Sequence, residues 1–134
     1  MTIVADASAL VEHVLRSERA EAISGAVENE GADLHIPALC DVEVASALRG
    51  ALLGGKLTDE RAGEALDDYL DLPLARHGHE SLLPRILELR ESFTAYDAVY
   101  VALAERLDAA LLTADDGLAA SARRQSQIEV LPAS

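Results

Sequence analysis

The chain has 134 residues, of which 24 are acidic and 11 are basic, and its formal net charge at pH 7 is −13. This excess of acid disfavours a protein that coats nucleic acid through a broad basic surface. It is compatible with a site where clustered carboxylates bind divalent cations. Half of the residues are hydrophobic, which predicts one packed globular domain over residues 1–134.

Membrane insertion and secretion are both disfavoured by the sequence. No apolar run approaches the roughly 20 residues that a membrane-spanning helix needs. The first residues, MTIVADAS, lack the basic segment that begins a signal peptide. Cys40 is the one cysteine, so neither an intrachain disulfide nor a cysteine zinc cluster can form. We therefore expect a cytoplasmic protein with no membrane partner.

Short apolar segments alternate along the chain with segments of helical character. The expected strands are Thr2–Asp6, Leu34–Pro37, Leu72–Arg76, Ala110–Asp115 and Ile128–Leu131. Two short helices are expected within residues 8–30, with Ser17 as the candidate N-cap of the second. The next helix, over 39–53, ends at Gly54-Gly55, and Thr58 caps the one that follows. Further helices are expected over 80–92, over 94–107 and after Asp115.

Strands separated by helices predict right-handed crossovers, and hence an α/β fold with a parallel sheet that helices cover on both faces. Such sheets bind ligands at the carboxyl ends of the strands, where the strand order reverses. Asp6 ends the first expected strand and Asp115 ends the fourth. Their carboxylates are therefore expected at the same edge of the sheet. The alternative interpretation is that Asp6 only terminates a strand, and its place at the ligand-binding edge favours a functional role.

Two further acids lie on expected helices among apolar or small neighbours. Glu43 has Leu39 and Ala47 one turn to either side, so it is expected to face inward, whereas Asp41 is interpreted as a solvated acid. Asp97 lies one turn into the apolar helix TAYDAVYVALAERL. No lysine or arginine lies within a helical turn of Asp97.

Burying several carboxylates without a counter-charge costs several kcal/mol each, so a bound cation is the simplest remedy. Mg²⁺ or Mn²⁺ suits oxygen ligands, whereas zinc prefers histidine or cysteine. The histidines show no recurring metal-ligand spacing, and His77 and His79 are interpreted as surface residues of a loop.

Structural roles compete with the metal-binding interpretation. Asp97 is also placed to form a capping box with Thr94, and the two roles are compatible. Ser8 is a candidate N-cap, and one of Asp115 and Asp116 is expected to cap the last helix. Tyr96 and Tyr100 are interpreted as packing residues.

The chain resembles the PIN domain and, within that family, the VapC-type toxins of bacterial toxin–antitoxin pairs. The resemblance rests on IVADASAL, PALCDVEVASALRG, YDAVYVALAERL and LLTADDGLA, in this order and spacing along essentially the whole chain. It implies a three-layer α/β/α fold with a mostly parallel sheet of about five strands.

The same resemblance implies site residues, activity and partners. The acidic metal-binding positions of the family match Asp6, Glu43, Asp97 and Asp115, and the accompanying hydroxyls match Ser8 and Thr113. Asp116 stands where members often have a basic or polar residue, which leaves the roles of Asp115 and Asp116 open. The expected protein is an endoribonuclease that depends on Mg²⁺ or Mn²⁺, forms a homodimer and is inhibited by a VapB-type antitoxin.

Other classes fit the sequence less well. A phosphoacceptor receiver domain needs a lysine after its last strand, and the one lysine, Lys56, lies in mid-chain. A haloacid-dehalogenase-like phosphatase needs a second aspartate where this chain has Ser8. A non-catalytic interaction module with this fold stays open as the alternative.

Overall fold

The computed structural model describes residues 1–133. A five-stranded sheet runs through the molecule in the order β3-β2-β1-β4-β5, and every neighbouring pair is parallel. The strands are β1 Thr2–Ala5, β2 Asp33–Pro37, β3 Leu74–His77, β4 Ala110–Leu112 and β5 Val130–Leu131. The predicted α/β fold with a mostly parallel sheet of about five strands is confirmed.

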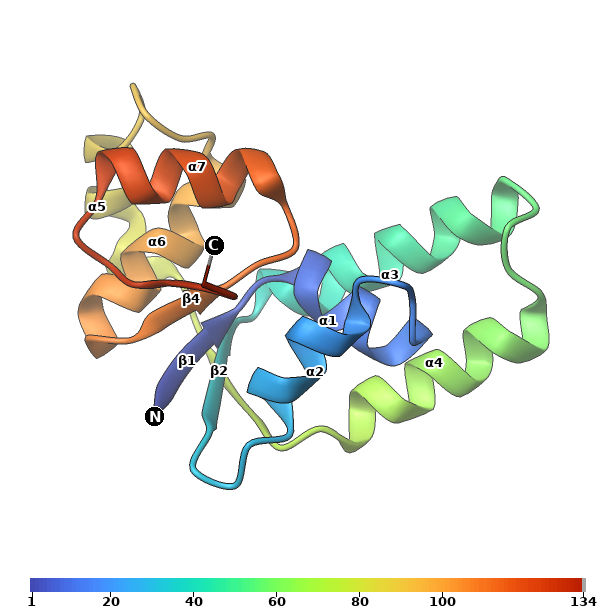
Figure 1. Ribbon diagram of the computed structural model, residues 1–134. Coiled ribbons are helices and arrows are strands. Elements are labelled where there is room, and N and C mark those ends of the chain that lie inside the picture. The colour runs from blue at the N-terminus through green and yellow to red at the C-terminus, as the bar shows by residue number, and fades with distance from the viewer. Residues whose placement is uncertain (134) are drawn as a thin grey trace.

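Helices cover both faces of this sheet (Figure 1). The helices on one side are α1 Ala7–Leu15, α2 Ala20–Val27, α3 Leu39–Leu53 and α4 Asp59–Asp71. Those on the other side are α5 Leu83–Glu88, α6 Ala95–Leu107 and α7 Asp116–Gln125, with a short 3₁₀ turn η1 at Glu80–Leu82 before α5. This division follows from right-handed crossovers, because the chain moves one way along the sheet through β2 and β3 and returns for β4 and β5.

The centre of the molecule is formed by β1, β4 and α6. Residues 98–104 of α6 are all buried, as expected for a helix that is hydrophobic on every side. This helix packs on β1, β2 and β4. Because α6 and the central strands form one rigid core, the residues at their ends are held in fixed relative positions.

Two of the expected helices differ from the observed ones. Ser17 does not cap α2, which begins after Arg19 without a side-chain cap; the Ser17 hydroxyl donates instead to Glu12. The helix expected over 80–92 is divided into η1 and the shorter α5, with Pro84 in the first turn of α5. Proline removes one backbone donor, so Pro84 cannot continue the hydrogen-bond pattern of a helix that began at Glu80, which explains the break.

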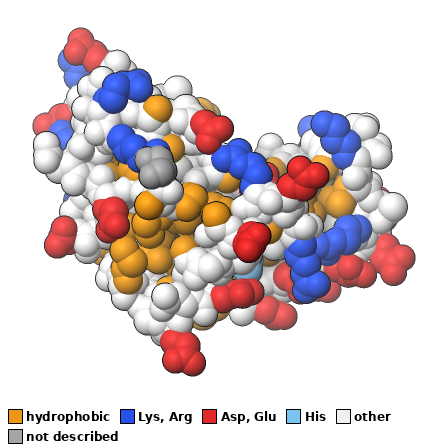
Figure 2. Space-filling view, in the orientation of Figure 1, with side chains coloured by type: hydrophobic (Ala, Val, Ile, Leu, Met, Phe, Trp, Pro, Cys, Tyr) orange, Lys and Arg blue, Asp and Glu red, His pale blue; other side chains and the backbone are white. Residues whose placement is uncertain are grey.

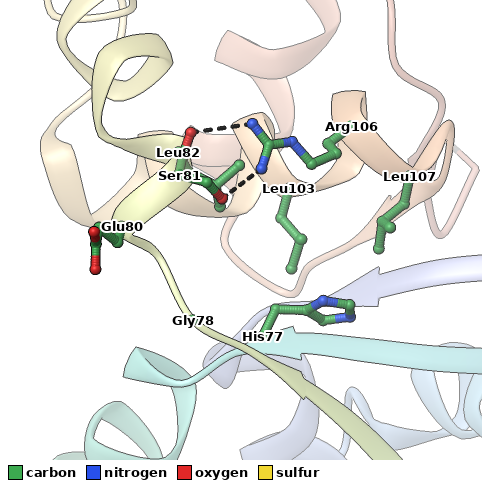
Figure 3. Close-up of a pocket in the computed structure, with 8 residues that line it drawn as sticks. All are labelled: His77, Gly78, Glu80, Ser81, Leu82, Leu103, Arg106 and Leu107. Atoms are coloured by element: carbon green, nitrogen blue, oxygen red, sulfur yellow. Dashed lines mark hydrogen bonds between the residues drawn. The ribbon is translucent and has the colours of Figure 1, made fainter.

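The interpretation of His77 as a loop residue was wrong, whereas His79 does lie in the loop after β3, where it is partly buried. His77 lies in β3, and its Nε2 is 2.8 Å from Nδ1 of His35. His79 accepts a hydrogen bond of 2.9 Å from the backbone N–H of Leu39, at the beginning of α3. His77 also lines a hollow of about 540 Å³, in which Arg106 binds the hydroxyl and carbonyl of Ser81 (Figure 3).

Two other side chains also differ from their expected surroundings. Asp41 is not simply solvated, because Arg76 pairs with its carboxylate at 2.8 Å and the Tyr69 hydroxyl donates to it at 2.6 Å. Tyr96 is 65% exposed rather than packed, whereas Tyr100 is buried as expected.

The surface carries charges of both signs. On the face drawn in Figure 2, basic side chains are interspersed with acidic ones, and an apolar area lies over the sheet edge near β5. Across residues 1–133, no helix combines the length and the hydrophobicity that crossing a membrane requires.

Candidate functional site

The strand order reverses between β1 and β4, the two central neighbours of the sheet. From β1 the chain continues toward β2 on one side, and from β4 it continues toward β5 on the other. Asp6 directly follows β1, and residues 113–115 directly follow β4. The predicted placement of Asp6 and Asp115 at one carboxyl edge of the sheet is therefore observed, at the position where such folds bind their ligands.

Asp6 is almost completely buried, with 4% of its surface exposed. Its Oδ1 accepts hydrogen bonds from the Ser8 hydroxyl at 2.7 Å and from the Ala9 backbone N–H at 2.9 Å. Its Oδ2 accepts one from the Thr113 hydroxyl at 2.5 Å. Asp6 is thus the N-cap of α1, and the expectation that Ser8 has this role was wrong.

The two hydroxyls join the loop after β1 to the loop after β4. Ser8 donates to Asp6 and accepts from the Ala114 backbone N–H at 3.0 Å, while Thr113 donates to Asp6 and accepts from the Asp115 backbone N–H at 3.0 Å. Each hydroxyl has one hydrogen, so both are fully committed as donors to the same carboxylate. This network fixes the orientation of Asp6 and explains why a hydroxyl residue stands at each of these positions.

Asp115 and Asp116 have different surroundings. Asp115 is the N-cap of α7, where its Oδ1 accepts from the Leu118 backbone N–H at 3.0 Å, so the capping role expected for one of the pair belongs to Asp115. A capping carboxylate uses one oxygen, which leaves Oδ2 available. Asp116 points to the solvent with its side chain 92% exposed, and it pairs with Arg19 at 3.0 Å.

Glu43 lies in the first half of α3 and is half-buried. Its Oε1 accepts a hydrogen bond of 2.5 Å from the hydroxyl of Tyr100 on α6. The sequence interpretation assigned Tyr100 to packing alone, although Tyr100 shares a helix face with Asp97 one turn earlier, and that spacing was the available signal.

Asp97 lies in the first turn of α6 and is half-buried. Its backbone N–H donates to the Thr94 hydroxyl at 3.1 Å, so Thr94 is the N-cap as predicted. Among the described residues, no hydrogen bond or ion pair is recorded for the Asp97 carboxylate itself, which leaves both of its oxygens free for a ligand.

The four carboxylates influence one another electrostatically. Burial raises the pKa of Asp6 above its ordinary value, opposed by the hydrogen bonds from Thr113, Ala9 and Ser8, and the charge of Asp115 raises it further. The pKa of Asp97 is also raised, first by burial and then by the charges of Asp115 and Glu43. Asp6, Glu43, Asp97 and Asp115 therefore belong to one cluster of like charges.

The donor chemistry of this cluster fits a hard divalent cation. Within residues 1–133, none of the four acids forms an ion pair with a basic side chain. Each has an oxygen that is not saturated by hydrogen bonds, and oxygen is the ligand that Mg²⁺ and Mn²⁺ prefer. A dication would offset both the burial and the mutual repulsion that raise the pKa values of Asp6 and Asp97.

The side chains do not form a closed coordination sphere as they stand. In the part of the chain that the structure describes, no group of three or more His, Cys, Asp or Glu side chains is close enough to hold a metal ion. Uncompensated carboxylates repel one another, and a bound cation would remove that repulsion. Asp97 is the least constrained of the four side chains, because its carboxylate accepts no hydrogen bond from the described residues, whereas Asp6, Glu43 and Asp115 each accept at least one.

Comparison with known proteins agrees with the fold and the motifs. The family model for the PIN domain matches residues 3–124. The VapC ribonuclease Mb0985 of Mycobacterium bovis is 38% identical over 130 residues, which cover 97% of this chain and 98% of that protein. Ribonuclease VapC12 of Mycobacterium tuberculosis is 36% identical over 129 residues, covering 96% and 98%.

Solved structures show the same fold at lower sequence identity. PAE2754 from Pyrobaculum aerophilum superposes with a TM-score of 0.70 at 22% identity, covering 97% of this chain and 83% of that one. VapBC2 from Rickettsia felis, solved with a DNA fragment from their promoter, gives 0.68 at 13% identity, covering 97% of each chain. The chain belongs to the PIN-domain family and, within it, to the VapC group.

Proposed function

We propose that this protein is a metal-dependent endoribonuclease, the toxin of a toxin–antitoxin pair, which hydrolyses RNA phosphodiester bonds with Mg²⁺ or Mn²⁺. The observation that carries the proposal is the set of four mutually repelling carboxylates, without basic partners in the described chain, at the point where the strand order reverses. The ribonuclease names of full-length relatives at 36–38% identity support the same activity.

The residues that would hold the cation are Asp6, Glu43, Asp97 and Asp115. A bound divalent cation supplies a water activated at neutral pH and stabilises the negative charge of the transition state. The chain itself supplies orientation: Ser8 and Thr113 fix Asp6, and the backbone N–H of Leu118 fixes Asp115. Both oxygens of the Asp97 carboxylate are free, so we expect Asp97 to contribute most to binding of the divalent cation.

A hollow of about 510 Å³ lies next to Thr113, the hydroxyl partner of Asp6. Arg19, which also lines it, is a basic side chain that can contact a phosphate, and Glu18 and Glu21 line the same hollow. A phosphate is repelled by the bare acids, so the cation must reverse the local field before substrate binds. We therefore expect weak RNA binding in a chelator and stronger binding with Mg²⁺.

We also propose a VapB-type antitoxin, a homodimer and a cytoplasmic location. Helices α3 and α4 expose large apolar side chains that suit an amphipathic helix laid across them: Val42, Leu53, Leu66 and Leu70. The structure of VapBC2 from Rickettsia felis, which has the same fold, supports an antitoxin partner.

The decisive experiment incubates antitoxin-free protein with total cellular RNA, with and without Mg²⁺ or Mn²⁺, and maps the cut ends. Cleavage is expected only with the metal and only in the wild type, not in Asp97→Asn. Asp67→Asn is the matched control, because it removes an exposed carboxylate of α4 far along the chain from the cluster. Metal-independent cleavage, or undiminished cleavage by Asp97→Asn, would refute the proposal.

Thermal unfolding separates this proposal from a non-catalytic interaction module. Mn²⁺ should raise the melting temperature of the wild type, since a ligand that binds the folded state stabilises it. Asp97→Asn should unfold at the same or a higher temperature than the wild type in chelator, because one repelling charge is gone, and should respond little to Mn²⁺. A module that does not use its acids would show no shift with Mn²⁺ in either protein.

A further inference from the structure

One hydrogen bond links the two helices that carry Glu43 and Asp97. The hydroxyl of Tyr100 on α6 donates to Oε1 of Glu43 on α3 at 2.5 Å, across 57 positions of sequence. Tyr100 is 2% exposed, so its ring is fixed by the surrounding core. A glutamate has three side-chain torsions, and a short bond to a fixed donor removes much of that freedom.

The position of Tyr100 on its helix relates this bond to the acid cluster. Tyr100 follows Asp97 by three residues on α6, so the two side chains lie on the same helix face. The helix that carries the free carboxylate of Asp97 therefore also carries the donor that orients Glu43. With Oε1 occupied by Tyr100, Oε2 is the oxygen of Glu43 that is left for a ligand.

A second tyrosine makes the same kind of bond nearby, but in a different setting. Tyr69 of α4, also 2% exposed, donates its hydroxyl to Asp41 at 2.6 Å, two residues before Glu43 on α3. Asp41 already has a basic partner, because Arg76 binds both of its oxygens at 2.8 and 3.0 Å. Glu43 has no basic partner among the described residues, and Tyr100 is its recorded side-chain donor.

We propose that Tyr100 is a positioning residue of the candidate metal centre, which orients Glu43 so that its Oε2 faces the divalent cation. The inference rests on the proposed function, since it assigns Tyr100 a role in holding that same cation. The positioning role of Tyr100 differs from a packing role, because positioning depends on the hydroxyl group alone. The aromatic ring would fill the core equally well without that hydroxyl.

The test compares Tyr100→Phe with the matched control Tyr69→Phe. Each variant loses one buried hydroxyl that donates to a carboxylate of α3, so a purely structural effect should be similar in both. Isothermal titration with Mn²⁺ and steady-state RNA cleavage are the readouts. Tyr100→Phe should bind Mn²⁺ about 10-fold more weakly, in the range usual for partners of metal ligands, with kcat lowered and KM for RNA changed less than about twofold. Tyr69→Phe should retain wild-type Mn²⁺ affinity.

A double-mutant cycle shows whether Tyr100 acts through Glu43. In a Glu43→Gln background, Tyr100→Phe should reduce Mn²⁺ affinity by less than about twofold further, because residues that act as a unit are not additive. If Tyr100→Phe fails to fold, Glu43→Asp is the second variant; its shorter side chain draws the carboxylate away from Tyr100 and should weaken Mn²⁺ binding similarly.

Several results would overturn the inference. These are wild-type Mn²⁺ affinity in Tyr100→Phe or in Glu43→Asp, an equal loss in Tyr69→Phe, or the same loss from Tyr100→Phe with and without Glu43. A wild-type protein that neither binds Mn²⁺ nor cleaves RNA would refute the proposed function itself. That outcome is distinguishable, because it appears before any variant is made.

Discussion

The hydroxyl of Thr113 donates a hydrogen bond of 2.5 Å to Oδ2 of Asp6, although 107 positions separate the two residues. Thr113 directly follows β4 and Asp6 directly follows β1, and these two strands are neighbours in the sheet. The bond therefore joins the two loops at the strand-order reversal, and it satisfies a carboxylate that has almost no contact with solvent. The stability of the fold and the orientation of Asp6, a candidate metal-binding residue, therefore both depend on the hydrogen bond between Thr113 and Asp6.

Replacing Thr113 with valine keeps the shape of the side chain and removes its donor. An unsatisfied buried acceptor costs about 1–3 kcal/mol, so the free energy of unfolding in urea should fall by that amount. Metal-dependent RNA cleavage should fall about 10- to 100-fold. Thr58→Val is the control, since its hydroxyl caps α4 through Arg61. It should lose roughly 1 kcal/mol of stability and keep full cleavage. Equal cleavage by both variants would contradict the role of Thr113.

One pair of substitutions distinguishes the roles of Asp115 and Asp116. Asp115→Asn keeps a good N-cap for α7, so the fold should be retained while cleavage is lost with the carboxylate. Asp116→Asn removes an exposed partner of Arg19, and such pairs contribute about 0–1 kcal/mol, so both stability and cleavage should change little. Cleavage rates and urea unfolding check both statements. Loss of cleavage in Asp116→Asn alone would reverse the assignment.

The pair His35–His77 should make stability depend on pH in the weakly acidic range. Burial and then the charge of His35 lower the pKa of His77 below its ordinary 6.5. As the pH drops through 6.5, the unfolded chain therefore binds more protons than the folded one. The free energy of unfolding should decrease over that range. Glu80 and Arg106 line the same hollow as His77, and Asp33 pairs with His35 on the other side of the histidine pair.

His77→Phe tests this dependence, because it keeps an aromatic ring and cannot titrate. Urea unfolding at pH 7.5 and at pH 5.5 should show a smaller loss of stability in the variant than in the wild type. An identical loss in both proteins would mean that His77 does not contribute to the pH dependence.

The central strand β4 should be the most sensitive part of the fold. Leu111 is fully buried and pairs with Val4 on one side and Val130 on the other. Leu111→Ala is expected to lower the free energy of unfolding by about 2–5 kcal/mol, from lost burial and the cavity left behind. Leu87→Ala, at a position that is 67% exposed on α5, should change it by less than about 0.5 kcal/mol. Similar losses at both positions would contradict the observed core.

The sequence was most informative where one physical signal acts locally. Alternating strand and helix patterns predicted the α/β class, and Thr94 and Thr58 were correctly predicted as N-caps because a cap bonds within one turn. Prediction was weaker where two local signals compete. Ser8 was a plausible cap, but Asp6 has that role, because the Ser8 hydroxyl binds both Asp6 and Ala114.

Long-range contacts account for most of the differences between prediction and structure. His77 was assigned to a loop, and the bond from α3 to His79 was not foreseen, because nothing in the sequence indicates that His77 pairs with His35 or that His79 accepts from Leu39. Asp41 was interpreted as solvated because Arg76 and Tyr69 are 35 and 28 positions away. Such pairings depend on how the helices pack.

The sequence by itself determined the parallel α/β class and the placement of Asp6 and Asp115 at one sheet edge, because crossovers through helices make the strands parallel, so that their carboxyl ends lie at the same edge. Only the tertiary structure decided which hydroxyl or amide binds Asp6, Glu43 and Asp115, including the bond from Tyr100 to Glu43. The reason is that side-chain hydrogen bonds form over about 3 Å. Positions at that precision depend on how α3, α6 and the central strands pack together.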